Sequence, residues 1–267
     1  MARERMDTAL YHAIRDQSLQ LHYQPIVSLR TGTITGFEVL ARWRWRDEEI
    51  PPRQFIPIAE QRGLIVPLGE YILGMACQQL HQWQTEGLAS QQQFIGINIS
   101  NRQLNQFGFA DKVRKTLWHY SLAGSNLHLE INPGITLRDS ATISTNLRLL
   151  KLEGIVCAID HFHNDDISAT AVDRLSADIL KFDWRLLNTN QAIEEATSTH
   201  ILRRIIAFAH HLGIAVTAGG VEDEQYLQQI LGTGCEYAQG YYFSPPVDAT
   251  RAGRILAGDP RWERVLH

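Results

Sequence analysis

Oxygen-bearing and cationic side chains stand at or near the ends of several short apolar segments of this 267-residue chain. In chain order these residues are Glu38, Asn98, Glu130, Asp160 and Lys181. Carboxylate and amide oxygens are the ligands that Mg²⁺ or Mn²⁺ prefers, with water completing an octahedron. Any one of these acids could instead be solvated or cap the next helix. The pattern therefore indicates a metal and phosphate site if all four oxygen donors meet in space.

A further candidate for phosphate recognition is Arg42, four positions after Glu38 in the same apolar segment. Successive strand residues point to opposite faces, so Glu38 and Arg42 are expected on one face. The planar guanidinium group matches a phosphate with two parallel hydrogen bonds. Arg44 and Arg46 also lie an even number of positions after Glu38, but we expect them beyond the strand, in a solvated loop.

Short aliphatic, β-branched and aromatic segments predict the strands that would position these residues. The predicted strands are Leu19–Leu29, Ile34–Trp43, Phe94–Ser100, Leu127–Asn132, Val156–Asp160, Asp178–Asp183, Ala215–Val221 and Tyr237–Phe243. Helical patterns alternate with them at Val66–Glu86, Phe109–Ser121, Ser140–Glu153, Ile167–Ser176, Ala192–Leu212 and Asp223–Leu231. Such alternation predicts an α/β fold, a modified TIM (β/α)8 barrel, with its site at the carboxyl ends of the parallel strands.

The barrel is expected to depart from the regular form at its start. Only residues 30–33 join the first two predicted strands, too few for a helical crossover, so these strands should be antiparallel. We expect residues 1–18 to form an N-terminal helix or linker and residues 19–267 to form the barrel domain. His128 alternates with Glu130, and we expect it to be a hydrogen-bonded core histidine.

Composition excludes several classes of protein. A hydrophobic content of 44% suits one large domain, and the net charge of −4 provides no basic field for general nucleic-acid binding. The three cysteines are widely spaced, which argues against a disulfide framework and favours a reducing compartment. The sequence contains neither an export signal nor an apolar run long enough to span a membrane. A cytoplasmic location is the expectation.

The order and context of these residues resemble the EAL domain family. The resemblance begins with Glu38-Val39-Leu40 and continues through Ile97-Asn98-Ile99-Ser100, Leu129-Glu130-Ile131-Asn132, Ala158-Ile159-Asp160 and Leu180-Lys181-Phe182-Asp183. It extends from about Leu21 to Pro246. Members of this family bind cyclic di-GMP, and the active ones hydrolyse it with Mg²⁺ or Mn²⁺.

The resemblance implies roles for individual residues. Glu38, Asn98, Glu130 and Asp160 would hold the first metal, and Lys181 would orient the attacking water, although Lys181 could instead pair with Asp178 or Asp183. The implied ligand-binding residues are Gln24, Glu38, Leu40, Arg42, Asn98, Glu130, Asp160, Glu222, Gln239 and Pro246. Leu40 could equally serve barrel packing, and Glu222 could be only a charge at a helix N-terminus.

Several departures from the family pattern fall on catalysis. The family's second aspartate after the fifth strand is His161, and its glutamate in the Ala-Glu-Gly-Val-Glu motif is Gly219. The glutamate that anchors the catalytic loop is Pro133, and two glycines of that loop are His163 and Asp165. These changes remove carboxylates from the second metal site and backbone freedom from the loop.

The sequence therefore predicts a cyclic di-GMP receptor with a degenerate site and no functional catalytic residues, Lys181 being vestigial. No cofactor is required on this interpretation, and Mg²⁺ or Mn²⁺ would bind at low occupancy. Two alternatives are a weakly active phosphodiesterase and a protein-interaction domain that no longer binds nucleotide. Expected partners are cyclic di-GMP and a protein partner or fused signalling domain, but no nucleic acid.

Overall fold

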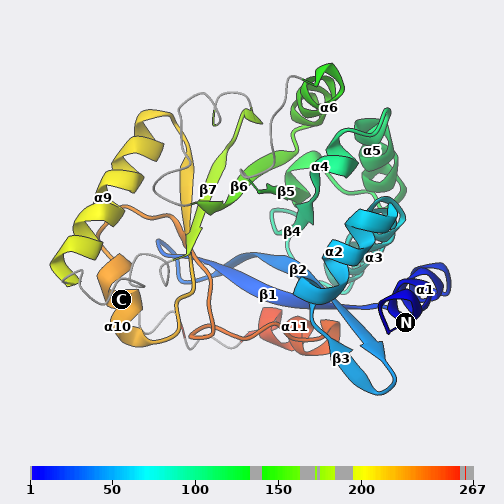
Figure 1. Ribbon diagram of the computed structural model, residues 1–267. Coiled ribbons are helices and arrows are strands. Elements are labelled where there is room, and N and C mark those ends of the chain that lie inside the picture. The colour runs from blue at the N-terminus through cyan, green and yellow to red at the C-terminus, as the bar shows by residue number, and fades with distance from the viewer. Residues whose placement is uncertain are drawn as a thin grey trace.

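A closed barrel forms the centre of the computed structural model (Figure 1), which describes residues 2–132, 140–162, 172, 175–183, 195–258 and 262. Within these ranges the barrel strands are β1 (Gln20–Ser28), β2 (Ile34–Trp45), β4 (Phe94–Ile99), β5 (Leu127–Ile131), β6 (Val156–Phe162), β7 (Ile179–Asp183), β8 (Ala215–Gly219) and β9 (Tyr237–Ala238). The sheet runs β1-β9-β8-β7-β6-β5-β4-β2, and the pairing of β1 with β2 closes it. The predicted α/β barrel is confirmed.

The antiparallel start of the barrel is also confirmed. β1 pairs antiparallel with both of its neighbours, β2 and β9, whereas the neighbouring pairs from β2–β4 through β8–β9 are parallel. The register places Gln24 of β1 directly opposite Glu38 of β2. A polar residue of the reversed strand is therefore brought beside the first acidic residue of the candidate site.

Helices surround the barrel (Figure 1). They are α1 (Ala2–Arg15), α2 (Pro52–Arg62), α3 (Ile65–Thr85), α4 (Asn101–Leu104), α5 (Phe109–His119), α6 (Ala141–Leu152), α9 (Glu195–His211), α10 (Glu224–Ile230) and α11 (Ala249–Leu256), with a 3₁₀ turn at Gly124–Asn126. Most of the predicted helix 167–176 lies outside the described residues. Helices α2, α4 and α11 were not predicted. Along the described chain, no helix combines the length and apolarity needed to cross a membrane.

Four predicted strand ends are wrong by two residues or more. β6 ends at Phe162 rather than Asp160, and β8 ends at Gly219 rather than Val221. The last strand ends at Ala238 rather than Phe243, because Gly240 packs so closely against the backbone of Val221 that the chain turns there. β2 continues to Trp45 and forms a hairpin with β3 (Glu48–Ile50), a strand outside the barrel. Arg44 is therefore a strand residue rather than part of a solvated loop.

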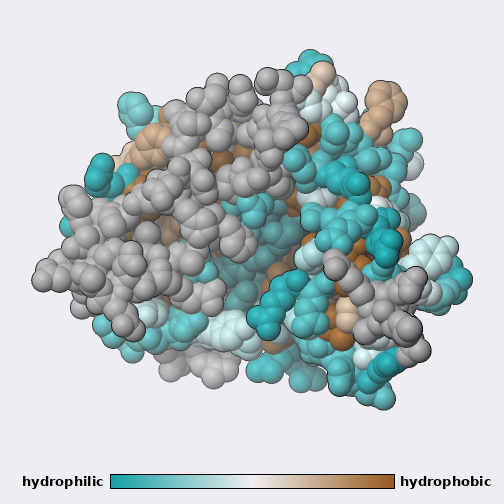
Figure 2. Space-filling view, viewed as in Figure 1, coloured by the Kyte–Doolittle hydropathy of each residue, from teal (hydrophilic) through white to brown (hydrophobic). Residues whose placement is uncertain are grey.

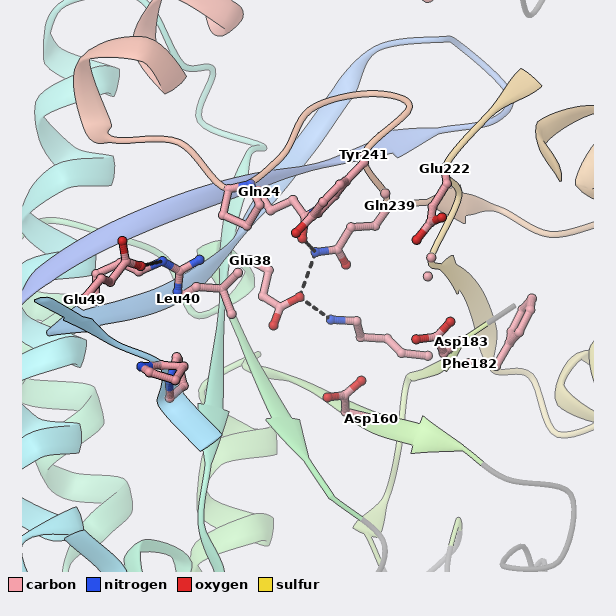
Figure 3. Close-up of a pocket in the computed structure, with 18 residues that line it drawn as sticks. Gln24, Glu38, Leu40, Glu49, Asp160, Phe182, Asp183, Glu222, Gln239 and Tyr241 are labelled. Carbon is pink, nitrogen blue, oxygen red and sulfur yellow. Dashed lines mark hydrogen bonds and ion pairs between the residues drawn. The ribbon is translucent and has the colours of Figure 1, made fainter. Parts of the chain in front are cut away.

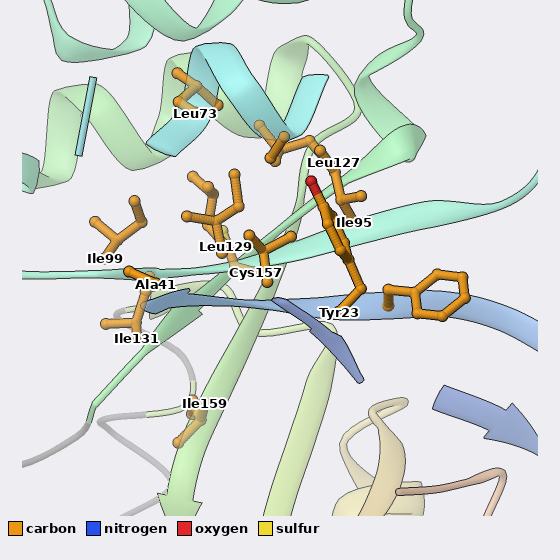
Figure 4. Packing of buried hydrophobic residues seen from close by; sticks show 14 of the residues in the cluster. Tyr23, Ala41, Leu73, Ile95, Ile99, Leu127, Leu129, Ile131, Cys157 and Ile159 are labelled. Atoms are coloured by element: carbon orange, nitrogen blue, oxygen red, sulfur yellow. The ribbon is translucent and has the colours of Figure 1, made fainter. Parts of the chain in front are cut away.

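The core lies inside the barrel and between the barrel and its helices. Tyr23 and Phe37 contact Trp83 of α3 with ring centroids 4.9 and 5.4 Å apart. Aliphatic side chains of successive strands gather beneath α3, as Figure 4 shows for Ile95 and Leu129. Helix α1 also contributes to this core, since Leu10 is fully buried. Packing on both faces fixes the strands and thus the positions of the residues at their ends.

Candidate functional site

The residues predicted to hold a metal converge at the carboxyl ends of the barrel strands. The Lys181 Nζ atom donates hydrogen bonds to Glu130 Oε2 at 2.6 Å and to Glu38 Oε2 at 3.1 Å. Asn98 Nδ2 donates to the other Glu38 oxygen at 3.0 Å. Four of the five residues identified first in the sequence therefore form one bonded cluster. The fifth, Asp160, lines the same cleft as Lys181, and its carboxylate helps to raise the pKa of that lysine.

Strand register explains this convergence. Asn98 of β4 pairs directly with Glu130 of β5, and Glu38 of β2 pairs with Gly96 of β4. Gly96 has a specific role, because a Cβ atom there would lie only 2.5 Å from Glu130 Oε1. The missing side chain leaves room for the Glu130 carboxylate to reach across the barrel mouth.

The electrostatics of the cluster follow from burial and excess negative charge. Lys181 and Glu130 are 6% and 2% exposed. Burial lowers the pKa of Lys181, but the carboxylates of Glu130, Glu38 and Asp160 together raise it above its ordinary value, so the ammonium group stays protonated. Burial raises the pKa of Glu130, Glu38 and Asp160 add to this rise, and Lys181 opposes it. The Lys181 ammonium group thus lies among carboxylates that would otherwise repel one another.

The alternative pairing of Lys181 with Asp178 is wrong. Asp178 instead forms an ion pair with Lys151 and accepts a hydrogen bond from the Cys157 backbone at 2.8 Å. Asp178 precedes β7, whereas Lys181 lies near the carboxyl end of that strand. The two side chains therefore serve opposite ends of the barrel.

The donor chemistry fits a hard divalent cation, but both Glu38 oxygens and Glu130 Oε2 already accept hydrogen bonds. Glu38, Glu130, Asp160 and Asn98 would supply carboxylate and amide oxygens of the kind that Mg²⁺ prefers. In the part of the chain that the structure describes, no three acidic, histidine or cysteine side chains adopt the arrangement of a metal site. A cation held by Glu38 and Glu130 would compete with the Lys181 ammonium for the same oxygens.

Two glutamines orient Glu38. Gln239 Nε2 donates to Glu38 Oε2 at 2.7 Å and to Gln24 Oε1 at 3.1 Å. Gln24 Nε2 in turn donates to the Ser244 backbone oxygen at 3.2 Å. Both glutamines are buried, so this amide chain links β1 and the segment after β9 to the acidic cluster.

A cleft of about 650 Å³ opens beside the cluster. Every predicted ligand residue except Asn98 and Glu130 lines it, namely Gln24, Glu38, Leu40, Arg42, Asp160, Glu222, Gln239 and Pro246. Figure 2 shows hydrophilic residues in the hollowed centre of this face. Asn98 and Glu130 line an adjoining cavity of about 900 Å³ between the barrel and helices α2 and α3, which shares Leu40 and Pro52 with the cleft.

Arg42 lies in the cleft, on the same face of β2 as Glu38, as predicted. Its Nη1 donates to the Ala41 backbone oxygen at 3.0 Å, and its Nε lies 3.4 Å from Glu49 Oε1. The side chain is 15% exposed, so the cation is partly desolvated yet open to the cleft. Arg44 is exposed and donates to the Asp47 backbone oxygen at 3.4 Å.

Sequence reasoning missed other cleft residues. Glu49 lies at one end of the cleft, and Asp183 lies toward the other, near Glu222 (Figure 3). Tyr241, 66% exposed, also lines the cleft. Asp183 follows Lys181 by two positions, so strand alternation could have identified it. Glu49 depends on the unpredicted hairpin, for which alternating Trp43, Arg44 and Trp45 were the available signal.

Glu222 does not begin a helix. Asp223 is the N-cap of α10, and its side chain accepts a hydrogen bond from the Tyr226 backbone at 2.9 Å. Glu222 precedes this cap and lines the cleft. Its position therefore suits both a charge near the N-terminus of α10 and a contact in the cleft.

The residues that depart from the family pattern are only partly described. Gly219 ends β8, pairs with Asp183 and lines the cleft. A Cβ atom on Gly219 would lie 3.2 Å from the Phe182 backbone oxygen, a close contact that a small shift would relieve. His161 lies in β6, but its side chain, together with residues 133, 163 and 165, lies outside the described residues.

His128 is a core residue, as predicted, and its described contact is a ring stack. The imidazole lies 3.5 Å from the Phe94 ring, centroid to centroid, at an interplanar angle of 9°. Burial lowers the pKa of His128 to about 3, and the nearby Lys181 cation adds to this effect. His128 is thus neutral in the folded protein at ordinary pH.

Comparisons with known proteins agree with this geometry. Residues 7–246 match the family model described as the EAL domain. MucR of Pseudomonas aeruginosa, named a bifunctional diguanylate cyclase/cyclic di-GMP phosphodiesterase, is 34% identical over 241 residues, which are 90% of this chain and 35% of that relative. The uncharacterized protein y4lL of Sinorhizobium fredii is 34% identical over 96% of this chain and 30% of its own length. The chain spans about a third of the length of these relatives.

Two solved structures of EAL proteins superimpose closely on this chain. The EAL enzyme Bd1971, in its form bound to cAMP and cyclic-di-GMP, superimposes with a TM-score of 0.86 and 26% identity, over 96% of this chain and 69% of that one. The phosphodiesterase PaMucR in complex with c-di-GMP superimposes with a TM-score of 0.84 and 32% identity, over 93% of this chain and 99% of that one.

Proposed function

Because the chain belongs to the EAL domain family, we propose that it binds cyclic di-GMP at the barrel mouth and signals without efficient hydrolysis. One observation carries the proposal: Arg42, Gln24 and Gln239 line one cleft with Glu38, while Gly219 lines the same cleft without a side chain. The groups suited to hold a nucleotide are kept, and a carboxylate of the catalytic pattern is lost.

In this proposal each cleft residue recognises one part of the ligand. Arg42 binds a phosphate through its guanidinium group. The amides of Gln24 and Gln239 serve a guanine edge or a bound water, and Glu222 provides a further polar contact. Leu40 and Pro246 offer apolar surface to a base. Glu38, Asn98, Glu130 and Asp160 complete the polar floor.

Slow hydrolysis follows because two carboxylates of the metal sites are missing and Lys181 is held by other side chains. Two-metal hydrolysis needs carboxylates for two cations about 3.5–4 Å apart. His161 and Gly219 supply neither of the two carboxylates that the family places there. Lys181, the residue expected to orient the attacking water, is bonded to Glu38 and Glu130. If Mg²⁺ or Mn²⁺ binds, its ligands are Glu38, Asn98, Glu130 and Asp160, and it would supply charge stabilisation at the phosphate.

Calorimetric titration with cyclic di-GMP, followed by chromatography of the same sample, tests the proposal. Binding with the nucleotide recovered intact is the expected result. Binding with steady linearisation would establish a phosphodiesterase instead. No heat of binding at micromolar protein would favour a domain that acts only through protein contacts.

A weakly active phosphodiesterase is the second candidate. Lys181 and its surrounding carboxylates are intact, and MucR, 34% identical, is named for both synthesis and hydrolysis of cyclic di-GMP. The product analysis distinguishes this candidate from the receptor. Since the chain spans about a third of its curated relatives, we also propose that it works beside a further signalling domain or a protein partner.

A further inference from the structure

We propose that Glu49 is an internal competitor for the phosphate site at Arg42 and thereby limits the affinity of the cleft for its ligand. The inference rests on the proposed function, in which Arg42 receives a phosphate. Glu49 Oε1 lies 3.4 Å from Arg42 Nε, and both side chains line the cleft. Figure 3 shows Glu49 at the end of the cleft opposite Glu222.

The hairpin that extends β2 places Glu49 there. Arg46 and Asp47 both have positive φ, 53° and 65°, which builds the tight turn between β2 and β3. The register sets Glu49 directly opposite Arg44, and Arg42 lies two residues before Arg44 on the same face. The carboxylate therefore lies within reach of two guanidinium groups and contacts the one inside the cleft.

Charge makes this contact a competitor. A phosphodiester and a carboxylate are both monoanions that seek the same donors of the guanidinium fork. A ligand phosphate at Arg42 must displace Glu49 or remain beside a like charge. The displaced carboxylate has a second partner available, because its cross-strand neighbour Arg44 is exposed. Binding thus exchanges one ion pair for another.

The size of the effect follows from exposure. The Glu49 side chain is 60% exposed, so water and salt weaken its pairing with Arg42. Exposed ion pairs of this kind change an equilibrium by about two- to fivefold. Removing the competing charge should tighten ligand binding by this factor, most strongly at low ionic strength.

Glu48 provides a matched control on the same hairpin. It is also exposed and acidic, but it pairs with Trp45 and does not line the cleft. Both Glu49→Gln and Glu48→Gln remove one negative charge from β3, so only an effect of position separates them. Calorimetry at low and high salt should give about two- to fivefold tighter binding of cyclic di-GMP for Glu49→Gln alone. In an Arg42→Ala background the gain should vanish.

A second measurement works without the nucleotide. The Arg42 Nε–H signal, followed by NMR during titration with inorganic phosphate, should respond at lower phosphate concentration in Glu49→Gln than in wild type or Glu48→Gln. Equal responses in all three proteins would overturn the inference, as would weaker nucleotide binding by Glu49→Gln, which would make Glu49 a ligand contact. If wild type binds no cyclic di-GMP, the proposed function fails, and the phosphate titration still decides the role of Glu49.

Discussion

The two sides of the barrel mouth differ in how many of the polar side chains of the family pattern they keep. On the side of β1, β2, β4 and β5, Gln24, Glu38, Asn98 and Glu130 belong to one network of hydrogen bonds. On the side of β8, the cleft is lined by the backbone of Gly219 where the family pattern has a glutamate. On the proposed function, contacts to the ligand are kept on the first side, while a carboxylate needed for hydrolysis is missing on the second.

Lys181 joins the two sides. It projects from β7 toward carboxylates of β2 and β5, and its ammonium group neutralises part of their charge. The protein itself therefore compensates part of the negative charge of the acidic cluster. On the proposed function, this compensation helps the site to hold a ligand and leaves less charge to activate a water.

The largest expected effect concerns hydrolysis. Unmodified protein should linearise cyclic di-GMP very slowly with either Mg²⁺ or Mn²⁺. Restoring both carboxylates, in His161→Asp with Gly219→Glu, should raise the rate on the order of 10²-fold, as expected for regained electrostatic stabilisation. Chromatographic product analysis over a time course measures the rate.

Single restorations should accomplish little, because each leaves one of the two carboxylates missing. Gly219→Gln, combined with His161→Asp, is the matched control, since it adds the same bulk beside Phe182 without a charge. Efficient turnover by the unmodified protein would show that the side of β8 still supports hydrolysis and would establish an active phosphodiesterase.

The next largest effect tests the binding side. Arg42→Ala should weaken cyclic di-GMP binding by about 1.5–3 kcal/mol, the value of a charge-assisted hydrogen bond to phosphate. Arg30→Ala is the control, because Arg30 is an exposed arginine outside the cleft. Calorimetry at one salt concentration compares the three proteins. Equal affinities for wild type and Arg42→Ala would remove the proposed position of the phosphate.

Much of this architecture was predictable from the sequence, for identifiable reasons. The alternation of strands and helices predicted the barrel, and the four-residue link predicted its antiparallel start. The even spacing of Glu38 and Arg42 placed both side chains on the same face of the strand. The β2–β3 hairpin was missed because its turn, Arg46-Asp47, lacks the glycine that marks such turns. The early end of β9 depends on a tertiary contact of Gly240, which no local pattern contains.

A third prediction concerns acid stability on the binding side. Burial lowers the pKa of His128 to about 3, below the unfolded value of about 6.5. The unfolded chain therefore binds more protons between these values, so stability present at pH 7 is lost as pH falls toward 3. Between pH 7 and pH 5 the free energy of unfolding should fall by about 2 kcal/mol from this group.

Urea unfolding at the two pH values measures this loss, which should nearly disappear in His128→Gln. His119→Gln, a change at an exposed position on α5, should keep it. A loss of the same size in His128→Gln and wild type would mean that other groups govern the acid response and that the stack on Phe94 tolerates a charged ring.

The smallest expected effect is that of metal removal. Lys181, Asn98 and Gln239 already donate to the carboxylates of Glu38 and Glu130, so chelation by EDTA should change the affinity for cyclic di-GMP by less than about threefold. Calorimetry with Mg²⁺ and with EDTA measures the difference. Lys181→Gln sharpens the test, because removing the ammonium group leaves the carboxylates without their internal cation, and binding by this variant should then require a divalent metal. A large loss of wild-type affinity on chelation would mean that Glu38, Asn98, Glu130 and Asp160 hold a metal as part of the ligand site, and the two sides of the mouth would then act together in binding.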